Sequence, residues 1–240
     1  MQSNLYVSLS GQVMLERRLT TIATNIANQS VAGYRAEDVN FSTILSKTDK
    51  YPVAYAGTGR THISREAGLL SKTDNPLDVA IQGDGWFAMQ TPAGTVYTRD
   101  GRMHMQATGE LVSVDNHPIL DAGNTPLLVD PDAGPITIAK DGMITQNGRQ
   151  IGAIGLFQLD DNAKLQHYHN SGVLSDRQGV AVLDFTANGI AQGYVESANV
   201  NPILELSKLI TVSRSFEQIS TAMENSESSL RDSIKTLGGA

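Results

Sequence analysis

The chain has 240 residues, of which 25 are acidic and 18 are basic, so its net charge is −7. This length allows one large hydrophobic core or two modest ones. The acidic balance excludes a nucleic-acid binder, because no basic stripe is present to neutralise phosphates. Cysteine is absent, which excludes disulfides, thiolate metal sites and thiol catalysis.

The beginning of the chain does not resemble a secretory signal peptide. Met-Gln-Ser-Asn-Leu-Tyr contains no basic residue, and no apolar block of signal-peptide length follows it. No stretch approaches the roughly 18 consecutive apolar residues that a membrane-spanning helix needs. We therefore expect no membrane insertion, and either a cytosolic protein or one that is exported without a cleaved signal.

A first helix is predicted from about Ser3 or Asn4, either of which can cap it, to about Asn28. Its apolar residues recur at three- and four-residue spacing, which is typical of a coiled-coil seam. Gly11 and several threonines lower its intrinsic helicity, so this helix is expected to need packing in order to form. The seam residues are Leu5, Leu15, Leu19, Ile22 and Ile26, and Leu9 and Val13 form a neighbouring apolar line.

Residues 36–69 are predicted to form a connector or extended arm, because the stretch is largely polar and holds Lys47, Asp49 and Lys50 close together. Turn signals then recur throughout residues 70–195, as in Gly83-Asp84-Gly85 and Asp100-Gly101. Short strand-like runs without intervening helices favour an antiparallel all-β domain, sandwich- or barrel-like. The expected strands are 77–82, 86–90, 95–98, 111–114, 136–139, 151–159, 180–184 and 190–195.

A last helix is predicted to begin after Pro202 and to end near Gly238, within a C-terminal segment of residues 196–240. It carries a second seam and, beside it, a further apolar line. Two interpretations stay open: the two seams pair with each other in one chain, or they pair with other subunits. The further line favours partners, because one helix pair would leave it exposed. The seam holds Leu209, Val212, Phe216, Ile219, Met223, Leu230 and Leu237, and the further line holds Ile203, Leu206 and Ile210.

Motifs of enzymes are weak in this chain. Gly83-Asp84-Gly85 does not continue as a phosphate-binding loop into a helix, so a turn is the better interpretation. His167 and His169 could begin a metal site, but no further histidine has ligand-like spacing, and a surface loop is favoured. We therefore expect no catalytic residue, no metal and no cofactor. A cell-wall hydrolase with paired carboxylates is the remaining enzymatic alternative.

Three ordered groups of residues resemble motifs of the bacterial flagellar rod and hook axial proteins. Together they span nearly the whole chain, which makes the resemblance more specific than any single motif. Val31-Ala32 and Ala198 depart from the family pattern, in which Thr-Pro and Ser are usual. The groups are Asn25-Ile26-Ala27-Asn28 with Gly33-Tyr34-Arg35; Asp78-Val79-Ala80-Ile81-Gln82-Gly83-Asp84-Gly85-Trp86-Phe87 with Tyr97-Thr98-Arg99-Asp100-Gly101; and Glu196-Ser197-Ala198-Asn199-Val200-Asn201 with Glu205-Leu206, Leu209-Ile210 and Arg214-Ser215-Phe216-Glu217.

The resemblance implies a structural subunit of the basal-body rod, the shaft that crosses the periplasm and transmits torque. Within the family, Asn75-Pro76-Leu77-Asp78 and Gly85-Trp86 are most similar to the proximal rod branch, and a distal rod or hook component is the alternative. The implied partners are copies of itself, other rod proteins and the flagellar type III export apparatus, with the terminal helices (1–35 and 196–240) as the assembly module. The implied interface residues are Leu5, Leu9, Val13, Leu15, Leu19, Ile22, Ile26, Asn28, Gly33, Tyr34, Asn199, Val200, Leu206, Leu209, Ile210, Val212, Arg214, Phe216, Glu217, Ile219, Met223 and Leu230.

Overall fold

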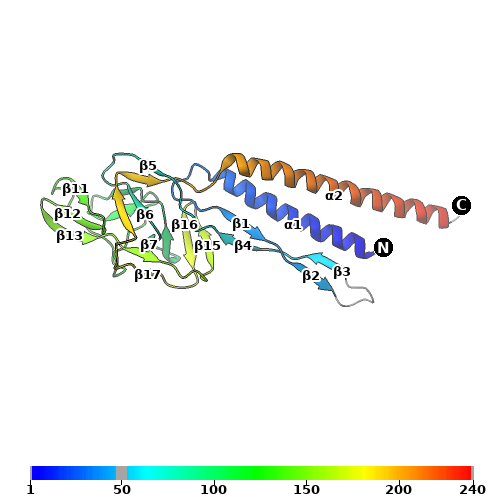
Figure 1. Ribbon diagram of the computed structural model, residues 1–240, viewed down its shortest axis with the longest axis horizontal. Helices are drawn as coiled ribbons and strands as arrows, with labels where there is room; N and C mark the ends of the chain where they lie inside the picture. Colours follow the sequence, from blue (N-terminus) through cyan, green and yellow to red (C-terminus); the bar gives the residue numbers. More distant parts are fainter. Residues whose placement is uncertain (1, 47–52, 239–240) are drawn as a thin grey trace. The chain divides into compact units, whose positions relative to one another are not determined.

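The computed structural model in Figure 1 describes residues 2–46 and 53–238 of the chain. The chain divides into two compact units. Unit 1 contains Met1–Ala27, Glu37–His62 and Asn201–Ala240, and unit 2 contains Asn28–Ala36 and Ile63–Val200. The chain therefore passes between the units at residues 27/28, 36/37, 62/63 and 200/201.

Unit 1 is built on two helices, α1 (Gln2–Ala27) and α2 (Pro202–Leu237), which confirms the predicted helices at both ends of the chain. The Asn201 side chain caps α2 by accepting hydrogen bonds from the backbone of Ile203 and Leu204, and Pro202 follows it at the first helical position. The helices are antiparallel, because Gln12 donates to Ser220 at 2.9 Å while Asn25 donates to Glu205 at 3.4 Å.

The two predicted seams face each other within this one chain, except that Leu237 at the end of α2 was predicted in the seam and is exposed by 88%. Leu15, Ile22 and Val212 are buried at the contact between α1 and α2. Of the two interpretations left open by the sequence, the structure therefore shows the intramolecular one, in which α1 and α2 of one chain form a helix pair. Around the buried residues pack the half-buried Met14, Leu19, Ile26, Leu209, Phe216 and Ile219. The side chains of Leu5 and Leu230 lie outside the described residues.

Four strands complete unit 1: β1 (Glu37–Asn40), β2 (Thr43–Ser46), β3 (Val53–Ala56) and β4 (Arg60–Ile63), of which Ile63 belongs to unit 2. β1 pairs with β4, and β2 pairs with β3 in an antiparallel hairpin. The stretch is thus more regular than its polar composition indicates. Contacts with α1 hold it, since Ala56 N–H donates to Ser10 and Arg17 donates to Thr58 O. Lys47, Asp49 and Lys50 lie outside the described residues.

Unit 2 is all-β, and every strand pairing in it is antiparallel. Its strands are β5 (Leu70–Lys72), β6 (Val79–Gln82), β7 (Trp86–Thr91), β8 (Gly94–Thr98), β9 (Met103–Met105), β10 (Leu111–Ser113), β11 (Ile136–Ile138), β12 (Met143–Gln146), β13 (Arg149–Ala153), β14 (Leu156–Gln158), β15 (Leu165–Tyr168), β16 (Gly172–Ser175), β17 (Val180–Ala181), β18 (Gly189–Gln192) and β19 (Tyr194–Glu196).

The largest sheet of unit 2 has six strands in the order β15-β16-β8-β7-β14-β17. Its edge strands β15 and β17 do not pair with each other, so among the described strands no closed barrel forms, and the barrel-like alternative is wrong. The other sheets are β11-β12-β13 and the pairs β9-β10, β6-β18 and β5-β19.

Two strands that the sequence predicts as continuous are each divided in the structure. The run 151–159 divides near Gly155, where an added Cβ would meet the backbone of Asp121 at 2.6 Å. The run 190–195 divides at Gly193, whose φ is +77° and whose two flanking strands pair with different partners. Glycine permits both changes of direction.

The core of unit 2 consists of two clusters of buried side chains. The larger one includes Val79, Phe87 and Ile119, and the smaller one includes Trp86 and Phe157. The core thus lies against both faces of the central strand β7, as its almost uninterrupted burial requires. Among the described residues, neither helix holds a stretch long and apolar enough to cross a membrane.

Candidate functional site

The polar residues of the family motifs gather in two clusters, one inside each unit. In unit 1, Asn25 near the end of α1 forms a reciprocal pair with the backbone of Glu37: its Nδ2 donates to Glu37 O at 2.9 Å, and Glu37 N–H donates to its Oδ1 at 2.9 Å. Asn25 Nδ2 also donates to Glu205 of α2, whose carboxylate pairs with Lys208 at 2.6 Å. Asn25 thereby ties α1, β1 and α2 together.

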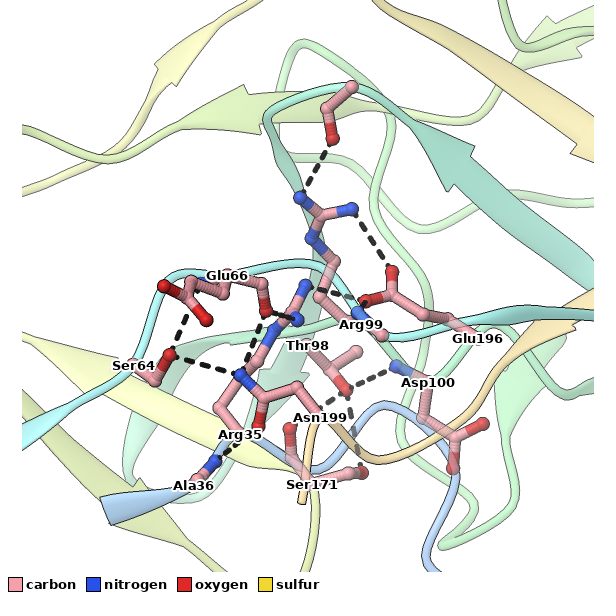
Figure 2. Close-up of polar contacts among 12 residues, drawn as sticks. Arg35, Ala36, Ser64, Glu66, Thr98, Arg99, Asp100, Ser171, Glu196 and Asn199 are labelled. Carbon is pink, nitrogen blue, oxygen red and sulfur yellow. Dashed lines mark hydrogen bonds and ion pairs between the residues drawn. The ribbon is translucent and has the colours of Figure 1, made fainter. Parts of the chain in front are cut away.

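In unit 2, the carboxylate of Glu196 lies between two buried guanidinium groups, as Figure 2 shows. One oxygen is 2.7 Å from Arg35 and the other is 3.1 Å from Arg99. The side chains of Glu196, Arg35 and Arg99 are exposed by 0%, 1% and 2%, respectively. Gly68 N–H donates to the first oxygen at 2.7 Å. The carboxylate is thus held by hydrogen bonds from Arg99 and Gly68 and by its ion pair with Arg35, as a buried anion must be to persist.

The two arginines complete their contacts with backbone carbonyls and an aromatic ring. Arg35 donates to Glu66 O, and Arg99 donates to Gly83 O at 2.9 Å. Both guanidinium carbons lie near the ring of Trp86, at 5.6 and 5.8 Å from its centroid, within the range of cation–π attraction. Burial lowers the pKa of Arg35 to about 10, and also lowers that of Arg99, while the negative charge of Glu196 opposes both shifts.

Asn199 forms the second part of this cluster (Figure 2). Its Oδ1 accepts from Ala36 N–H at 2.6 Å, and its Nδ2 donates to Ser64 Oγ at 3.0 Å and to Glu66 O at 2.8 Å. Its backbone N–H donates to Tyr34 O at 3.2 Å. We call Arg35, Arg99, Glu196 and Asn199, with these partners, the junction cluster, because each of the four chain crossings lies near one of its segments.

Gly33 and Tyr34 pack residues 28–36 against the rest of unit 2. Gly33 adopts φ +67°, and an added Cβ would come within 2.2 Å of the Asp100 backbone nitrogen, so only glycine fits there. Its N–H donates to Glu196 O at 2.8 Å. The Tyr34 ring is buried and stacks on His167 with their centroids 5.1 Å apart.

Unit 1 also exposes apolar residues outside the paired seams. On α1 these are Leu9 and Val13, at 47% and 49% exposure. On α2, Ile203 and Ile210 are exposed by 77% and 60%, and Leu206 lies on the same side of the helix. Together these five residues are called the outer apolar lines. They are the kind of exposed surface that marks an interface.

The structure thus divides most of the predicted interface residues into three kinds. One kind fills the α1–α2 contact, a second forms the outer apolar lines, and a third lies in or beside unit 2's own packing. Arg214 and Glu217 are exposed on α2, and Met223 is half-buried. The third kind comprises Asn28, Gly33, Tyr34, Asn199 and Val200.

Sequence reasoning gave no role to Asn25, Arg35, Arg99, Glu196 and Glu205, although all five stood in the quoted motifs. Their partners are far away in the chain, so the pairings were not visible in the sequence.

The residues of the weak enzymatic motifs make structural contacts in the fold. The turn at Gly83–Gly85 supplies the Gly83 carbonyl to Arg99, and Asp84 N–H donates to Asn188. His167 stacks on Tyr34, and the His169 ring packs edge-on against Tyr168. Within residues 2–46 and 53–238, no group of three or more His, Asp or Glu side chains could hold a metal ion.

Comparison with known proteins shows which class of protein the chain resembles over two long segments. Residues 80–146 match the family model described as the flagellar hook protein FlgE/F/G D1 domain. Residues 191–236 match the model described as the flagellar basal body rod FlgEFG protein C-terminal. The first model covers much of the β-rich unit 2, and the second covers the end of unit 2 and nearly all of α2. The class is thus the hook and basal-body rod proteins.

Full-length relatives narrow the class. The chain is 49% identical over 238 residues to a protein from Mesorhizobium japonicum, 43% over 240 residues to one from Rhizobium meliloti, and 34% over 245 residues to one from Caulobacter vibrioides. Each match covers at least 99% of both proteins, and each relative is named flagellar basal-body rod protein FlgF. The chain belongs to the FlgF family of flagellar basal-body rod proteins. Its role is that of a structural rod subunit, and these relatives give no support to a hydrolase.

Proposed function

We propose that the chain joins the rod through the outer apolar lines of α1 and α2, in contacts of the coiled-coil type with helices of neighbouring subunits. The observation that carries this proposal is that the seams of α1 and α2 are already filled by each other, yet Leu9, Val13, Ile203, Leu206 and Ile210 remain exposed. Exposed apolar lines on a surface helix are costly in water and are covered by partners.

The paired seams have a supporting part in this proposal. They hold α1 and α2 side by side, so that both outer lines are presented on one rigid support. Arg214 and Glu217 flank the outer line of α2 and would set the direction of approach through their charges. Leu5 and Leu230, for which no side-chain contacts are described, belong to the same proposed interface.

The proposed partners are copies of this chain and other rod proteins, reached after export through the flagellar type III apparatus without a cleaved signal. The proposed location is the periplasm-spanning rod of the basal body, where torque passes through the helix contacts. The proposed role needs no catalysis, cofactor or metal.

The test is a double substitution, Ile203→Ser with Ile210→Ser, in a strain that lacks the native gene. Both side chains are mostly exposed, so the purified subunit should fold with unchanged helix content. We expect export of the variant but no incorporation into basal bodies, seen by immunoblotting of purified basal bodies, and loss of motility. The matched control is Leu183→Ser, since Leu183 is exposed by 85% in unit 2.

Normal incorporation of the double variant would overturn the proposed interface. Failure of the control to the same degree would also contradict it, because any loss of exposed apolar area would then suffice. Export is measured separately, from the amount of variant in the periplasmic fraction, so that a block in secretion is distinguished from a block in assembly.

A further inference from the structure

Three short stretches of unit 2 lie where the chain passes to and from unit 1: residues 33–36, 64–66 and 196–199. Asn199 is hydrogen-bonded to both of the other stretches. It reaches Tyr34 and Ala36 in the first, and Ser64 and Glu66 in the second. Ser64 N–H also donates to Ala36 O at 2.8 Å, which links these two stretches directly.

We propose that Asn199 is the positioning residue of a hydrogen-bonded network that joins residues 33–36, 64–66 and 196–199 inside unit 2. We call this network the lock, and we infer that it forms without contacts from α1 and α2. Every member of the junction cluster, and every partner named for it, belongs to unit 2. Residues 28–36 are separated in sequence from the rest of unit 2 by a segment of unit 1, and the lock is what retains them. The inference concerns the isolated chain and does not depend on the assembly proposed above.

An amide side chain is required at position 199 by its neighbours. Ala36 N–H can only donate and Glu66 O can only accept, so the side chain must present an acceptor to one and a donor to the other. Asparagine does both with fixed geometry. Aspartate has the same shape but would set a second acceptor against Glu66 O, which would then keep only Arg35 of its two side-chain donors.

Glu196 provides the second arm of the lock. Its carboxylate holds Arg35 from the first stretch and Gly68 N–H just after the second, while its backbone oxygen accepts from Gly33 N–H. A single carboxylate thus balances two buried guanidinium groups, which would repel each other without it. Both arms start within four residues of each other, immediately before Asn201 caps α2.

The stretches also fit closely in space. An added Cβ on Gly68 would lie 1.9 Å from Ser197 O, and one on Gly33 would lie 2.2 Å from the Asp100 backbone nitrogen. These approaches leave the backbones few alternative positions, because the interior is packed to high density. The lock is therefore specified by unit 2 itself.

Amide hydrogen exchange of the full-length chain tests the lock. Leu19→Pro breaks α1, since proline removes a backbone donor and clashes within the helix. We expect the α1 amides to lose protection in this variant, while those of Gly33, Ala36 and Gly68 keep their rates within about twofold. Trp86, the only tryptophan of the chain, packs against both arginines, so its emission spectrum should also stay unchanged.

Asn199→Asp is the complementary variant. We expect exchange at Gly33 and Ala36 to rise about tenfold or more, with a changed Trp86 emission, because two donor contacts are lost and two acceptors oppose each other. The matched control is Asn201→Asp, the same chemical change at an exposed helix cap where aspartate serves as well, and it should leave these amides unaffected. If Asn199→Asp does not fold, Ser64→Ala, which removes one acceptor, should raise exchange at Ala36 about fivefold.

Two results would overturn the inference. The first is loss of protection at Gly33 and Ala36 together with α1 in Leu19→Pro, which would mean that the helices hold the segment. The second is unchanged exchange at Ala36 in Asn199→Asp or, where that variant does not fold, in Ser64→Ala.

Discussion

Replacement of Glu196 by glutamine removes the charge that separates two buried arginines and leaves the side-chain shape almost unchanged. The carboxylate and the guanidinium groups of Arg35 and Arg99 are exposed by no more than 2%. Removing one partner of a buried ion pair costs about 3–5 kcal/mol, because the other charge stays buried without compensation. We expect a loss of this size in the free energy of unfolding of unit 2.

Urea unfolding followed by the emission of Trp86 is the assay, since this single tryptophan lies in unit 2 beside both arginines. With a slope of about 1–3 kcal/mol per molar urea, the midpoint should fall by about 1–5 M. The control is Asp74→Asn, which removes an ion pair of similar length, 2.8 Å to Lys72, whose side chains are exposed by 75% and 62%. Exposed pairs contribute little, so its midpoint should not move.

A second variant separates charge from shape. In Arg35→Met with Glu196→Gln, one of the two uncompensated charges is removed, so part of the lost stability should return. A Glu196→Gln midpoint equal to that of the wild type would refute the reasoning. So would a double variant whose loss in free energy of unfolding exceeds the sum of the losses in its two single variants.

Three further predictions concern positions where the structure offers a matched pair or a single contact. Gly33→Ala should destabilise unit 2 by clearly more than Gly94→Ala in the same urea assay, because both glycines have positive φ but only Gly33 meets backbone atoms; strain alone costs about 1–2 kcal/mol. Ile22→Ala should cost about 2–5 kcal/mol in the helix pair, measured by circular dichroism, while Ile234→Ala at an exposed position should cost less than about 0.5 kcal/mol. Asn25→Ala should cost about 2 kcal/mol and raise amide exchange at Glu37, because it loses both bonds to that residue.

Local signals explain which elements were predictable from the sequence. The start of α2 follows from Asn201 and Pro202, and both helices follow from the spacing of their apolar residues. Strand β7 was predictable because it is a short, largely apolar run with a turn signal before it and another after it. These properties need no knowledge of the rest of the chain.

Features that depend on distant partners were not predictable. The strands of residues 37–63 are held by pairing with each other and by α1, so their polar composition indicated an irregular arm. The burial of Arg35 and Arg99 is tolerated only because Glu196 lies between them. Gly33 and Tyr34 were expected at an assembly interface on family grounds, and the structure places them against Asp100 and His167 inside unit 2.

The central claim is that the outer apolar lines are covered in the assembled rod. Because the chain contains no cysteine, Ile210→Cys introduces a single thiol at a position that is 60% exposed in the subunit. Its rate of reaction with a maleimide is measured in the purified subunit and in purified basal bodies, with Ile22→Cys as the thiol that is buried in the subunit itself. We predict fast reaction at position 210 in the subunit and strong protection in basal bodies; equal rates in the two would contradict the account.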